Sequence, residues 1–284
     1  MKTFDILIVG GGAAGIAAAK GAYDAGCRSI AIVDRKKSLG GVLLQCLHRG
    51  FGQNQDGPEY LSTLLESFPE DISFFGNTTV LSVTENRIAH LSGGKSIGFQ
   101  QLILAAGCRE IPMGALPIVG TRPEGVYTAG QMQEMINLHG IIPEGPVVIL
   151  GSGDLGLVMA NHLAQAGLDV TLVEKKTACG GMVRNQRCLW EWPIRLVCNA
   201  TIDEVLGEEK LKGCILSTGE TLPCKTLLIA AGLIPDRELI TDLRNAGWLH
   251  ICGNCNRVHP MIEAVIKEGY AAGIEAVFQV GGNV

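Results

Sequence analysis

The sequence offers few side chains whose types and spacing suit chemistry on a substrate, and the closest pair is two cysteines. Cys252 and Cys255 are separated only by Gly253 and Asn254. Two thiols at this spacing can form and break a disulfide, which makes them candidates for thiol–disulfide exchange. A turn with two buried thiols is the alternative, because free cysteine is among the most buried residue types. Zinc or an iron–sulfur cluster needs more ligands, and no second C-x-x-C exists, so we expect no metal site.

The other candidates for acid–base or thiol chemistry are isolated residues. His48 follows Gln45 and Cys46, and a proton relay there is one hypothesis. A histidine at the surface or at the edge of the core is the other. His259 precedes Pro260, which suits the first turn of a helix, so His259 is a candidate cap for that helix. The catalytic candidates are therefore His48, Cys46, Cys252 and Cys255.

The glycines carry a stronger signal, because one pattern occurs twice. Residues 5–15 read DILIVGGGAAG and residues 147–156 read VVILGSGDLG, each an apolar run followed by G-x-G-x-x-G. The first glycine permits a tight turn, the second lets backbone approach a pyrophosphate, and the third lets helix pack on strand. The helix N-terminus then offers unpaired N–H groups and a positive dipole end to phosphates. The fingerprint glycines are Gly10, Gly12 and Gly15, then Gly151, Gly153 and Gly156.

Each fingerprint is followed by a second β-rich run that ends in an acid. The strings SIAIVD and DVTLVE end at Asp34 and Glu174, which lie 24 and 23 residues after the first glycine of each fingerprint. An acid at this distance accepts hydrogen bonds from a ribose hydroxyl. Glu174 would also repel a 2′-phosphate, which favours NAD(H) over NADP(H), although Lys175 and Lys176 follow it.

The parallel extends beyond the acids. A Gly-Gly pair follows each acid, at 40–41 and 180–181, and a later apolar run in each copy closes on Ala-Ala-Gly, at Gly107 and Gly232. Two such modules predict two bound dinucleotides with electrons passing between them, which indicates an oxidoreductase.

Composition excludes several other classes. A length of 284 residues suggests two domains, and 38 glycines without a G-X-Y period exclude collagen. A hydrophobic content of 47% excludes a disordered chain, and a net charge of −5 argues against a nucleic-acid-binding surface. The apolar stretch 6–19 contains four glycines and is too short to span a bilayer, so we expect no integral membrane segment. Ten cysteines without a secretory signal indicate free thiols in the cytoplasm.

The order of these motifs resembles the FAD-dependent pyridine nucleotide-disulfide oxidoreductase superfamily. The series GGGAAG, Asp34, AAG, GSGDLG, Glu174, AAGLIPD and CGN before a helix covers nearly the whole chain, and a thioredoxin-reductase-like arrangement fits best. The strings at 40–52, 57–60, 108–137 and 252–259 look closer to flavoprotein subunits associated with FAD-linked dehydrogenases of the glycerol-3-phosphate dehydrogenase type. The NAD/FAD subunits of opine, proline and cyanide-forming dehydrogenases are similar more distantly.

The resemblance implies an α/β fold with two Rossmann-like, three-layer dinucleotide-binding domains. It implies a FAD-binding domain over residues 1–110 plus 250–284, with a NAD(P)-binding domain over 115–240 inserted between them. The expected FAD-binding residues are Gly10, Gly12, Ala13, Ala14, Gly15, Asp34, Arg35, Gly41, Gln45, Ala106, Gly107, Gly253 and Asn254. The expected NAD-binding residues are Gly151, Gly153, Asp154, Leu155, Gly156, Glu174 and Gly232.

The sequence departs from the family in three places. The family's disulfide reductases use two closely spaced cysteines, whereas the second module has only Cys179 and Cys188, nine residues apart. Asn254 stands where the family has an aspartate, so a carboxylate is lost. Only 16 residues separate Pro235 from Cys252, which predicts a trimmed FAD-domain sheet and weaker retention of FAD.

These features together predict hydride transfer between NAD(H) and FAD, with electrons passing to or from a partner dehydrogenase subunit or another electron-transfer protein. Residues 122–137 resemble a linker of the relatives and are expected to form a hinge and docking surface. A homo-oligomer stays open. The N-terminus of the last helix is expected to stabilise negative charge on the reduced flavin. One rival is a thiol–disulfide reductase using Cys252 and Cys255, and another is a non-enzymatic nucleotide-binding subunit. Direct substrate oxidation is disfavoured, because no substrate-cap domain is recognisable.

Overall fold

The two glycine-rich strings fall in different units of the chain. A computed structural model describes residues 1–243 and 246–281. Its contacts divide the chain into a first unit, Met1–Arg109 with Ile234–Val284, and a second unit, Glu110–Leu233. The second unit is thus inserted into the sequence of the first.

The chain passes between the units through two strands that pair with each other, β7 (Cys108–Glu110) and β17 (Leu233–Pro235). Residues 234–240, which the sequence assigned to the inserted domain, belong to the first unit. The hinge predicted at 122–137 is wrong in its position, because this segment carries β9 (Val126–Thr128) and most of α3 inside the second unit. Docking of a partner on it stays a prediction.

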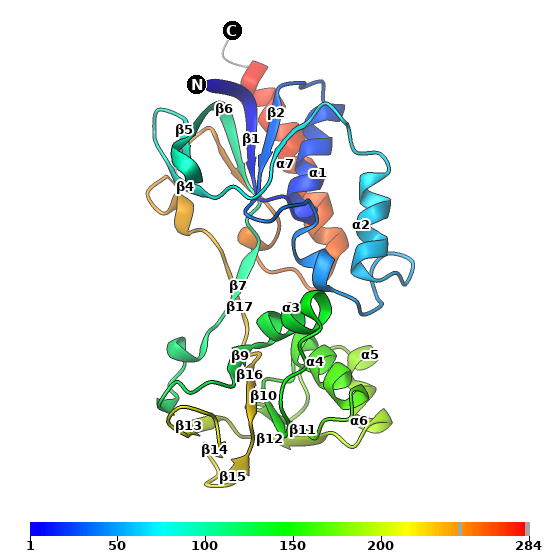
Figure 1. Ribbon diagram of the computed structural model, residues 1–284. Coiled ribbons are helices and arrows are strands. Elements are labelled where there is room, and N and C mark those ends of the chain that lie inside the picture. The colour runs from blue at the N-terminus through cyan, green and yellow to red at the C-terminus, as the bar shows by residue number, and fades with distance from the viewer. Residues whose placement is uncertain (244–245, 282–284) are drawn as a thin grey trace. The chain divides into compact units, whose positions relative to one another are not determined.

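A seven-stranded sheet forms the centre of the first unit (Figure 1). Its order is β3-β2-β1-β6-β5-β4, with β18 paired to β6. The strands are β1 (Lys2–Val9), β2 (Ile30–Val33), β3 (Ser73–Phe75), β4 (Val80–Val83), β5 (Ile88–Leu91), β6 (Ser96–Leu104) and β18 (Leu249–Ile251). The pairs that involve β1, β2, β3 and β18 are parallel, whereas β5 runs antiparallel to both neighbours.

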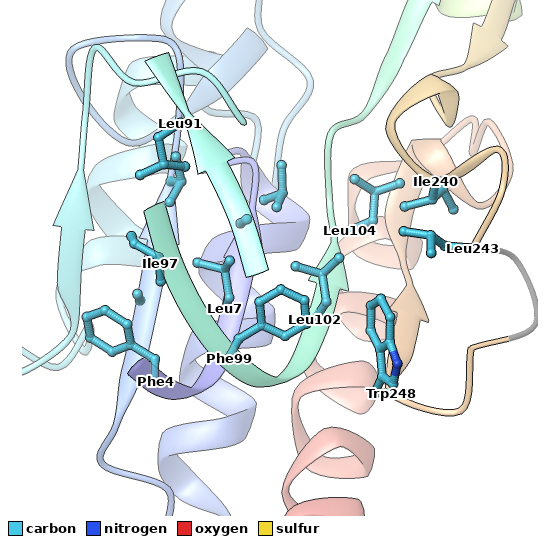
Figure 2. Close-up of a cluster of buried hydrophobic side chains, with 14 of the residues drawn as sticks. Phe4, Leu7, Leu91, Ile97, Phe99, Leu102, Leu104, Ile240, Leu243 and Trp248 are labelled. Carbon is cyan, nitrogen blue, oxygen red and sulfur yellow. The ribbon is translucent and has the colours of Figure 1, made fainter. Parts of the chain in front are cut away.

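Alternation along β1 directs its side chains into two cores. Leu7 and Val9 join a cluster on one face, which Figure 2 shows packed around Leu102 and Trp248. Ile6 and Ile8 join the cluster on the other face. Burial on both faces explains why the second half of the strand, residues 6–9, reads as an unbroken apolar run.

Two helices cover that second face, α1 (Ala13–Asp24) and α7 (Ile262–Gly281), and they lie side by side in Figure 1. Their backbones approach closely: a Cβ added at Gly269 would lie 2.3 Å from the backbone oxygen of Ala14. A glycine is therefore required where α7 crosses the first turn of α1. The shorter α2 (Gly57–Leu65) is the remaining α-helix among the described residues of this unit.

The second unit is built on a five-stranded parallel sheet with the order β12-β11-β10-β16-β9. The strands not yet given are β10 (Val147–Leu150), β11 (Val170–Glu174), β12 (Arg195–Cys198) and β16 (Thr226–Ile229). Helices α3 (Ala129–His139) and α4 (Asp154–Gln165) pack on one face, followed by the short α5 (Val183–Gln186) and α6 (Cys188–Glu191).

A smaller sheet packs on the other face, in the order β15-β14-β13-β8. Its strands are β8 (Val119–Gly120), β13 (Ile202–Leu206), β14 (Gly213–Leu216) and β15 (Thr221–Pro223). The second unit thus has a parallel sheet with helices on one face and a smaller sheet on the other, which agrees with the three-layer Rossmann-like domain that the resemblance implies. Within residues 1–243 and 246–281, no helix has the length and apolarity to cross a membrane.

Candidate functional site

The first glycine-rich turn joins β1 to α1, and two of its glycines are required by space. Gly10 has φ 108°, and a Cβ there would lie 2.4 Å from the backbone oxygen of Ala105. A Cβ at Gly15 would lie 1.8 Å from the backbone oxygen of Gly10. Gly12 differs, because the nearest atom to an added Cβ is the Cα of Gly41 at 3.9 Å. Gly12, at the start of α1, therefore has room for a Cβ, which would make only an ordinary van der Waals contact.

The second turn repeats these contacts. Gly151 has φ 107°, and its added Cβ would lie 2.4 Å from the backbone oxygen of Ala230. A Cβ at Gly156 would lie 2.1 Å from the backbone oxygen of Gly151. An added Cβ at Gly153 would meet no described atom within 4 Å. Gly12 and Gly153 occupy equivalent positions in the two modules, and each has room for an added Cβ.

The helices that follow these turns begin without a capping side chain. Gly12 and Gly153 are the N-caps of α1 and α4, and no described side chain caps either helix. Helices α2 and α3 differ, because side chains cap their N-termini. Asp56 and Glu59 form a capping box on α2, and Thr128 caps α3. The first N–H groups of α1 and α4 have no carbonyl partner within the helix, so they suit a phosphate.

An acid is tied to the first turn. Asp34 Oδ2 accepts from the N–H of Gly11 at 2.5 Å, and Oδ1 accepts from the N–H of Lys36 at 2.7 Å. Gly40 also reaches this turn, because its N–H donates to the carbonyl of Gly11 at 2.8 Å. Asp34 stays partly exposed beside the open start of α1, in a position to accept from a ribose.

Glu174 holds the equivalent position in the second module. Its Oε2 accepts from the N–H of Ser152 at 2.9 Å and from its hydroxyl at 2.7 Å, and its Oε1 accepts from the N–H of Lys176 at 2.9 Å. Burial alone would raise the pKa of Glu174, but the hydrogen bonds from Ser152 and Lys176 outweigh it and hold the pKa below its usual value. Glu174 is therefore ionised at neutral pH, and an anion here repels a phosphate.

A loop lies across the start of α4. Asp154 Oδ1 accepts from the N–H of Met182 at 2.8 Å and from Asn185 Nδ2 at 2.7 Å. The side chain of Asp154, a predicted NAD-binding residue, is therefore hydrogen-bonded to this loop. Leu155 follows it, half-buried, in the first turn of the helix. Gly232 has φ 131°, and its carbonyl accepts from the N–H of Ile111. These two residues adjoin the paired strands β17 and β7.

The turn at Gly253 and Asn254 packs against the first glycine-rich turn. Gly253 has φ 67°, and a Cβ there would lie 2.6 Å from the Cβ of Ala14. Asn254 Oδ1 accepts from the N–H of His259 at 3.0 Å. The following helix begins at Ile262, two residues after the predicted start.

Five further predicted FAD-binding residues belong to segments next to the first glycine-rich turn. Gly41 begins a 3₁₀ segment, Gly41–Gln45, and its added Cβ would lie 3.0 Å from the Cα of Gly12. Gln45 is at the other end of that segment. Ala106 and Gly107 follow β6, which pairs with β1. Arg35 is exposed. The structure thus brings Gly10–Gly15, Asp34, Gly41 and Gly253 together.

The candidate catalytic thiols are buried. Cys252 and Cys255 are both 0% exposed and free, and the Cys255 thiol donates to the carbonyl of Leu104 at 3.0 Å. Burial raises the pKa of both thiols and raises that of Cys46 to about 12. Because the thiolate is the reactive form, this environment favours the turn with two buried thiols over thiol–disulfide exchange.

His48 lies in a small aromatic group. Its ring centroid is 5.3 Å from that of Phe51, which in turn stacks on Tyr60. This placement at the edge of a hydrophobic cluster agrees with the second of the two hypotheses for His48.

Sequence reasoning missed one repeated residue. Asn77 and Asn199 have φ 51° and 54°, and they follow β3 and β12, the edge strands that pair with β2 and β11. Their N–H groups donate to the carbonyls of Lys36 and Lys176, both at 2.9 Å, so each asparagine closes the loop after the acid. The signal was present, because the strings GNTT and CNAT share N-x-T.

Two open helix ends, each beside a tethered acid, define a protein with two dinucleotide-binding modules. Residues 4–273 match the family model described as pyridine nucleotide-disulphide oxidoreductase, and the chain belongs to this family. The superfamily resemblance is thereby confirmed. The closer similarity to glycerol-3-phosphate dehydrogenase-associated subunits stays a prediction.

Individual relatives agree with the family. An opine oxidase subunit from Agrobacterium tumefaciens is 26% identical over 288 residues, covering 88% of this chain and 56% of that protein. Rubredoxin-NAD(+) reductase from Pseudomonas putida is 26% identical over 255 residues, covering 84% of this chain and 64% of that protein. The chain thus spans less than two thirds of the length of these relatives.

A solved structure confirms the fold. The thioredoxin reductase of T. acidophilum has a TM-score of 0.77 at 19% identity and covers 100% of this chain and 99% of its own. The predicted arrangement of two Rossmann-like domains in one chain is therefore confirmed.

Proposed function

We propose that this protein is a FAD-dependent oxidoreductase that transfers a hydride between NAD(H) and bound FAD. The observation that supports it is the pair of open helix N-termini, each with its own acid, in a chain of this family. We assign FAD to the first unit and NAD(H) to the second. The sequence predicted a FAD-binding domain over 1–110 plus 250–284 and a NAD(P)-binding domain over 115–240. We propose the same two domains with their edges at the unit boundaries, 109/110 and 233/234.

The first unit fits a flavin dinucleotide. The cradle at Gly12 is open, so the start of α1 can hold a pyrophosphate, and Asp34 can accept from the adenosine ribose. Gly253 and Asn254 would contact the nucleotide from the other side of the turn, because Gly253 packs on Ala14. Bound FAD would supply the isoalloxazine ring that takes up or gives up the hydride.

The second unit fits NAD(H) better than NADP(H). Glu174 is ionised and mostly buried, and its oxygens lie beside the turn at Gly151–Gly156. A 2′-phosphate would bring a second negative charge to this acid, whereas a 2′-hydroxyl can donate to it. The exposed Lys175 and Lys176 reduce this discrimination.

We propose that electrons leave or enter through another protein. One relative is called an oxidase subunit, and another is a reductase named after its protein acceptor. A partner dehydrogenase subunit or an electron-transfer protein is therefore the proposed exchange partner, and a homo-oligomer is compatible with it. The ten free thiols suit a reducing compartment, so we propose the cytoplasm.

The two rivals make different demands. A thiol–disulfide reductase needs an accessible thiolate, which the burial of Cys252 and Cys255 disfavours. A non-enzymatic nucleotide-binding subunit needs at least one module that cannot bind its cofactor, and both turns have the same open geometry.

An anaerobic titration tests the proposal. The purified protein is loaded with FAD, freed of excess, and mixed with NADH or NADPH while its visible spectrum is followed. We expect a bound-flavin spectrum that NADH bleaches faster than NADPH. A protein that retains no flavin supports the non-enzymatic rival, and a flavin that neither nucleotide bleaches overturns hydride transfer.

A further inference from the structure

One carboxylate holds the turn that carries Gly253 and Asn254, and no sequence motif singled it out. Glu268, in the second turn of α7, accepts from the N–H of Gly253 at 3.1 Å and from Nε2 of His259 at 2.6 Å. It also accepts from Nδ2 of Asn256. An ionised carboxylate only accepts hydrogen bonds, so it matches a turn that presents three donors.

The carboxylate and its partners are shielded from water. The side chain of His259 is 6% exposed and that of Glu268 is 25% exposed. Burial alone would raise the pKa of Glu268, but the hydrogen bonds from Asn256 and His259 outweigh it and keep the pKa below its usual value. The carboxylate is therefore charged at neutral pH, and the charge strengthens its hydrogen bonds to the turn.

The same turn is held from its other side by an arginine. Arg237 donates from Nε to the carbonyl of Cys255 at 2.5 Å and from its terminal nitrogen to the carbonyl of Asn256. The carbonyls of the turn thus bind a cation, while its donors bind Glu268. Two opposite charges fix one short segment.

The position of this segment matters because it touches the open end of α1. The added Cβ at Gly253 would lie 2.6 Å from the Cβ of Ala14, in the first turn of that helix. Gly269, the neighbour of Glu268, packs against the backbone oxygen of the same Ala14. Glu268 therefore links the crossing of α7 over α1 to the turn beside the phosphate-binding N–H groups.

We propose that Glu268 is a positioning residue for the flavin nucleotide: its carboxylate fixes Gly253 and Asn254 against the first turn of α1 and thereby sets the affinity for FAD. This inference rests on the proposed function, because it takes the first unit to be the FAD-binding unit. Without the carboxylate, three donors lose their acceptor and the turn is free to move away from the site, or onto it.

The substitution Glu268→Gln separates this role from simple packing. Glutamine has the same length, but its amide brings a donor to a place where the turn already presents donors. A space-filling role would survive this change, whereas an acceptor role would not. The matched control is Glu275→Gln, which removes the same charge from an exposed position on α7.

The readout is the dissociation constant of FAD for the apoprotein, measured by quenching of flavin fluorescence. We expect it to rise about tenfold or more in Glu268→Gln and to stay within about twofold of wild type in Glu275→Gln. Hydrogen exchange of the backbone at 253–259 should also become faster in the Glu268→Gln apoprotein. Asn256→Ala removes one of the three donors to Glu268, together with a side-chain oxygen that accepts from Arg237 at 3.4 Å. It provides a milder variant, with an expected rise of about threefold.

Circular dichroism and thermal unfolding of the apoprotein report whether the first unit of each variant is folded. The NADH affinity of the second unit, which we expect to be unchanged, shows that any effect is confined to the first unit. A Glu268→Gln protein that binds FAD as tightly as wild type overturns the inference and leaves the proposed function intact. The same holds if Glu268→Gln fails to fold and Asn256→Ala binds FAD like wild type. A wild-type protein that takes up no FAD overturns the proposed function, and this inference with it.

Discussion

The hydroxyl of Ser152 donates to Glu174 Oε2 at 2.7 Å and accepts from the N–H of Gly180 at 2.9 Å. One hydroxyl thus joins the acid of the second module to the Gly-Gly loop that follows it. In the first module Gly11 occupies the equivalent position, and it offers the acid only its backbone N–H. The two modules share a backbone plan but differ in how firmly the acid is held.

Replacing Ser152 with alanine should therefore weaken the second module selectively. A hydrogen bond contributes about 0.5–1.5 kcal/mol, so we expect the dissociation constant of NADH to rise by about threefold to tenfold. Titration of the FAD-loaded protein with NADH measures this. The FAD affinity serves as the control, and an unchanged NADH affinity would show that the hydroxyl has no part in holding the acid.

Gly12→Ala and Gly153→Ala form a reciprocal pair. Both positions are open, so an added methyl fits the apoprotein, but it occupies the space through which a phosphate approaches the backbone. We expect Gly12→Ala to weaken FAD at least about tenfold and to spare NADH, and Gly153→Ala to do the opposite. Thermal melting of both apoproteins should stay near wild type. Gly15→Ala, whose Cβ would lie 1.8 Å from a backbone oxygen, should fail this folding control.

Glu174→Gln tests the choice of nucleotide. The substitution removes the negative charge that a 2′-phosphate would face, while it keeps the length of the side chain. We expect the ratio of kcat/KM for NADH to that for NADPH to fall about tenfold, measured as steady-state reduction of an artificial acceptor. A ratio that stays constant would place the discrimination elsewhere, and Lys176→Gln is the first variant to examine in that case.

The double substitution of Cys252 and Cys255 by alanine tests the thiol rival. Both thiols are buried with raised pKa values, so we expect NADH-driven flavin reduction to proceed within about twofold of the wild-type rate. Stopped-flow absorbance of the FAD-loaded variant measures it. Loss of turnover with a disulfide substrate, alongside intact flavin reduction, would favour the thiol reductase.

Glu268 should make the free energy of unfolding of the first unit depend on pH. Its pKa lies below the ordinary value of 4.5, so its contribution is fully present above that pH and is lost as the pH falls through the folded-state pKa. Denaturant unfolding between pH 7 and pH 3.5 should show wild type and Glu268→Gln converging towards the acid end. A constant difference across this range would contradict an ionised Glu268.

Much of this arrangement was predictable, because it depends on local sequence. The strings around Gly10 and Gly151 fix the turns, and the acids at Asp34 and Glu174 follow from strand length alone. The hinge prediction failed because residues 122–137 add a strand to the parallel sheet, and pairing with β16 is not a local property. The role of Glu268 could not be predicted for the same reason. Glu268 lies 15 residues after Gly253, which it binds, and the contact depends on how α7 packs in the folded unit.

The first unit is discontinuous in the sequence, and this has a consequence for its biosynthesis. During translation the sheet around β1 emerges first, then all of Glu110–Leu233, and only afterwards the helix that carries Gly269 and Glu268. The inserted unit has its whole sequence on one stretch and can fold on the ribosome. The first unit must wait for α7, so its two-helix layer can be completed only after the inserted unit has been synthesised.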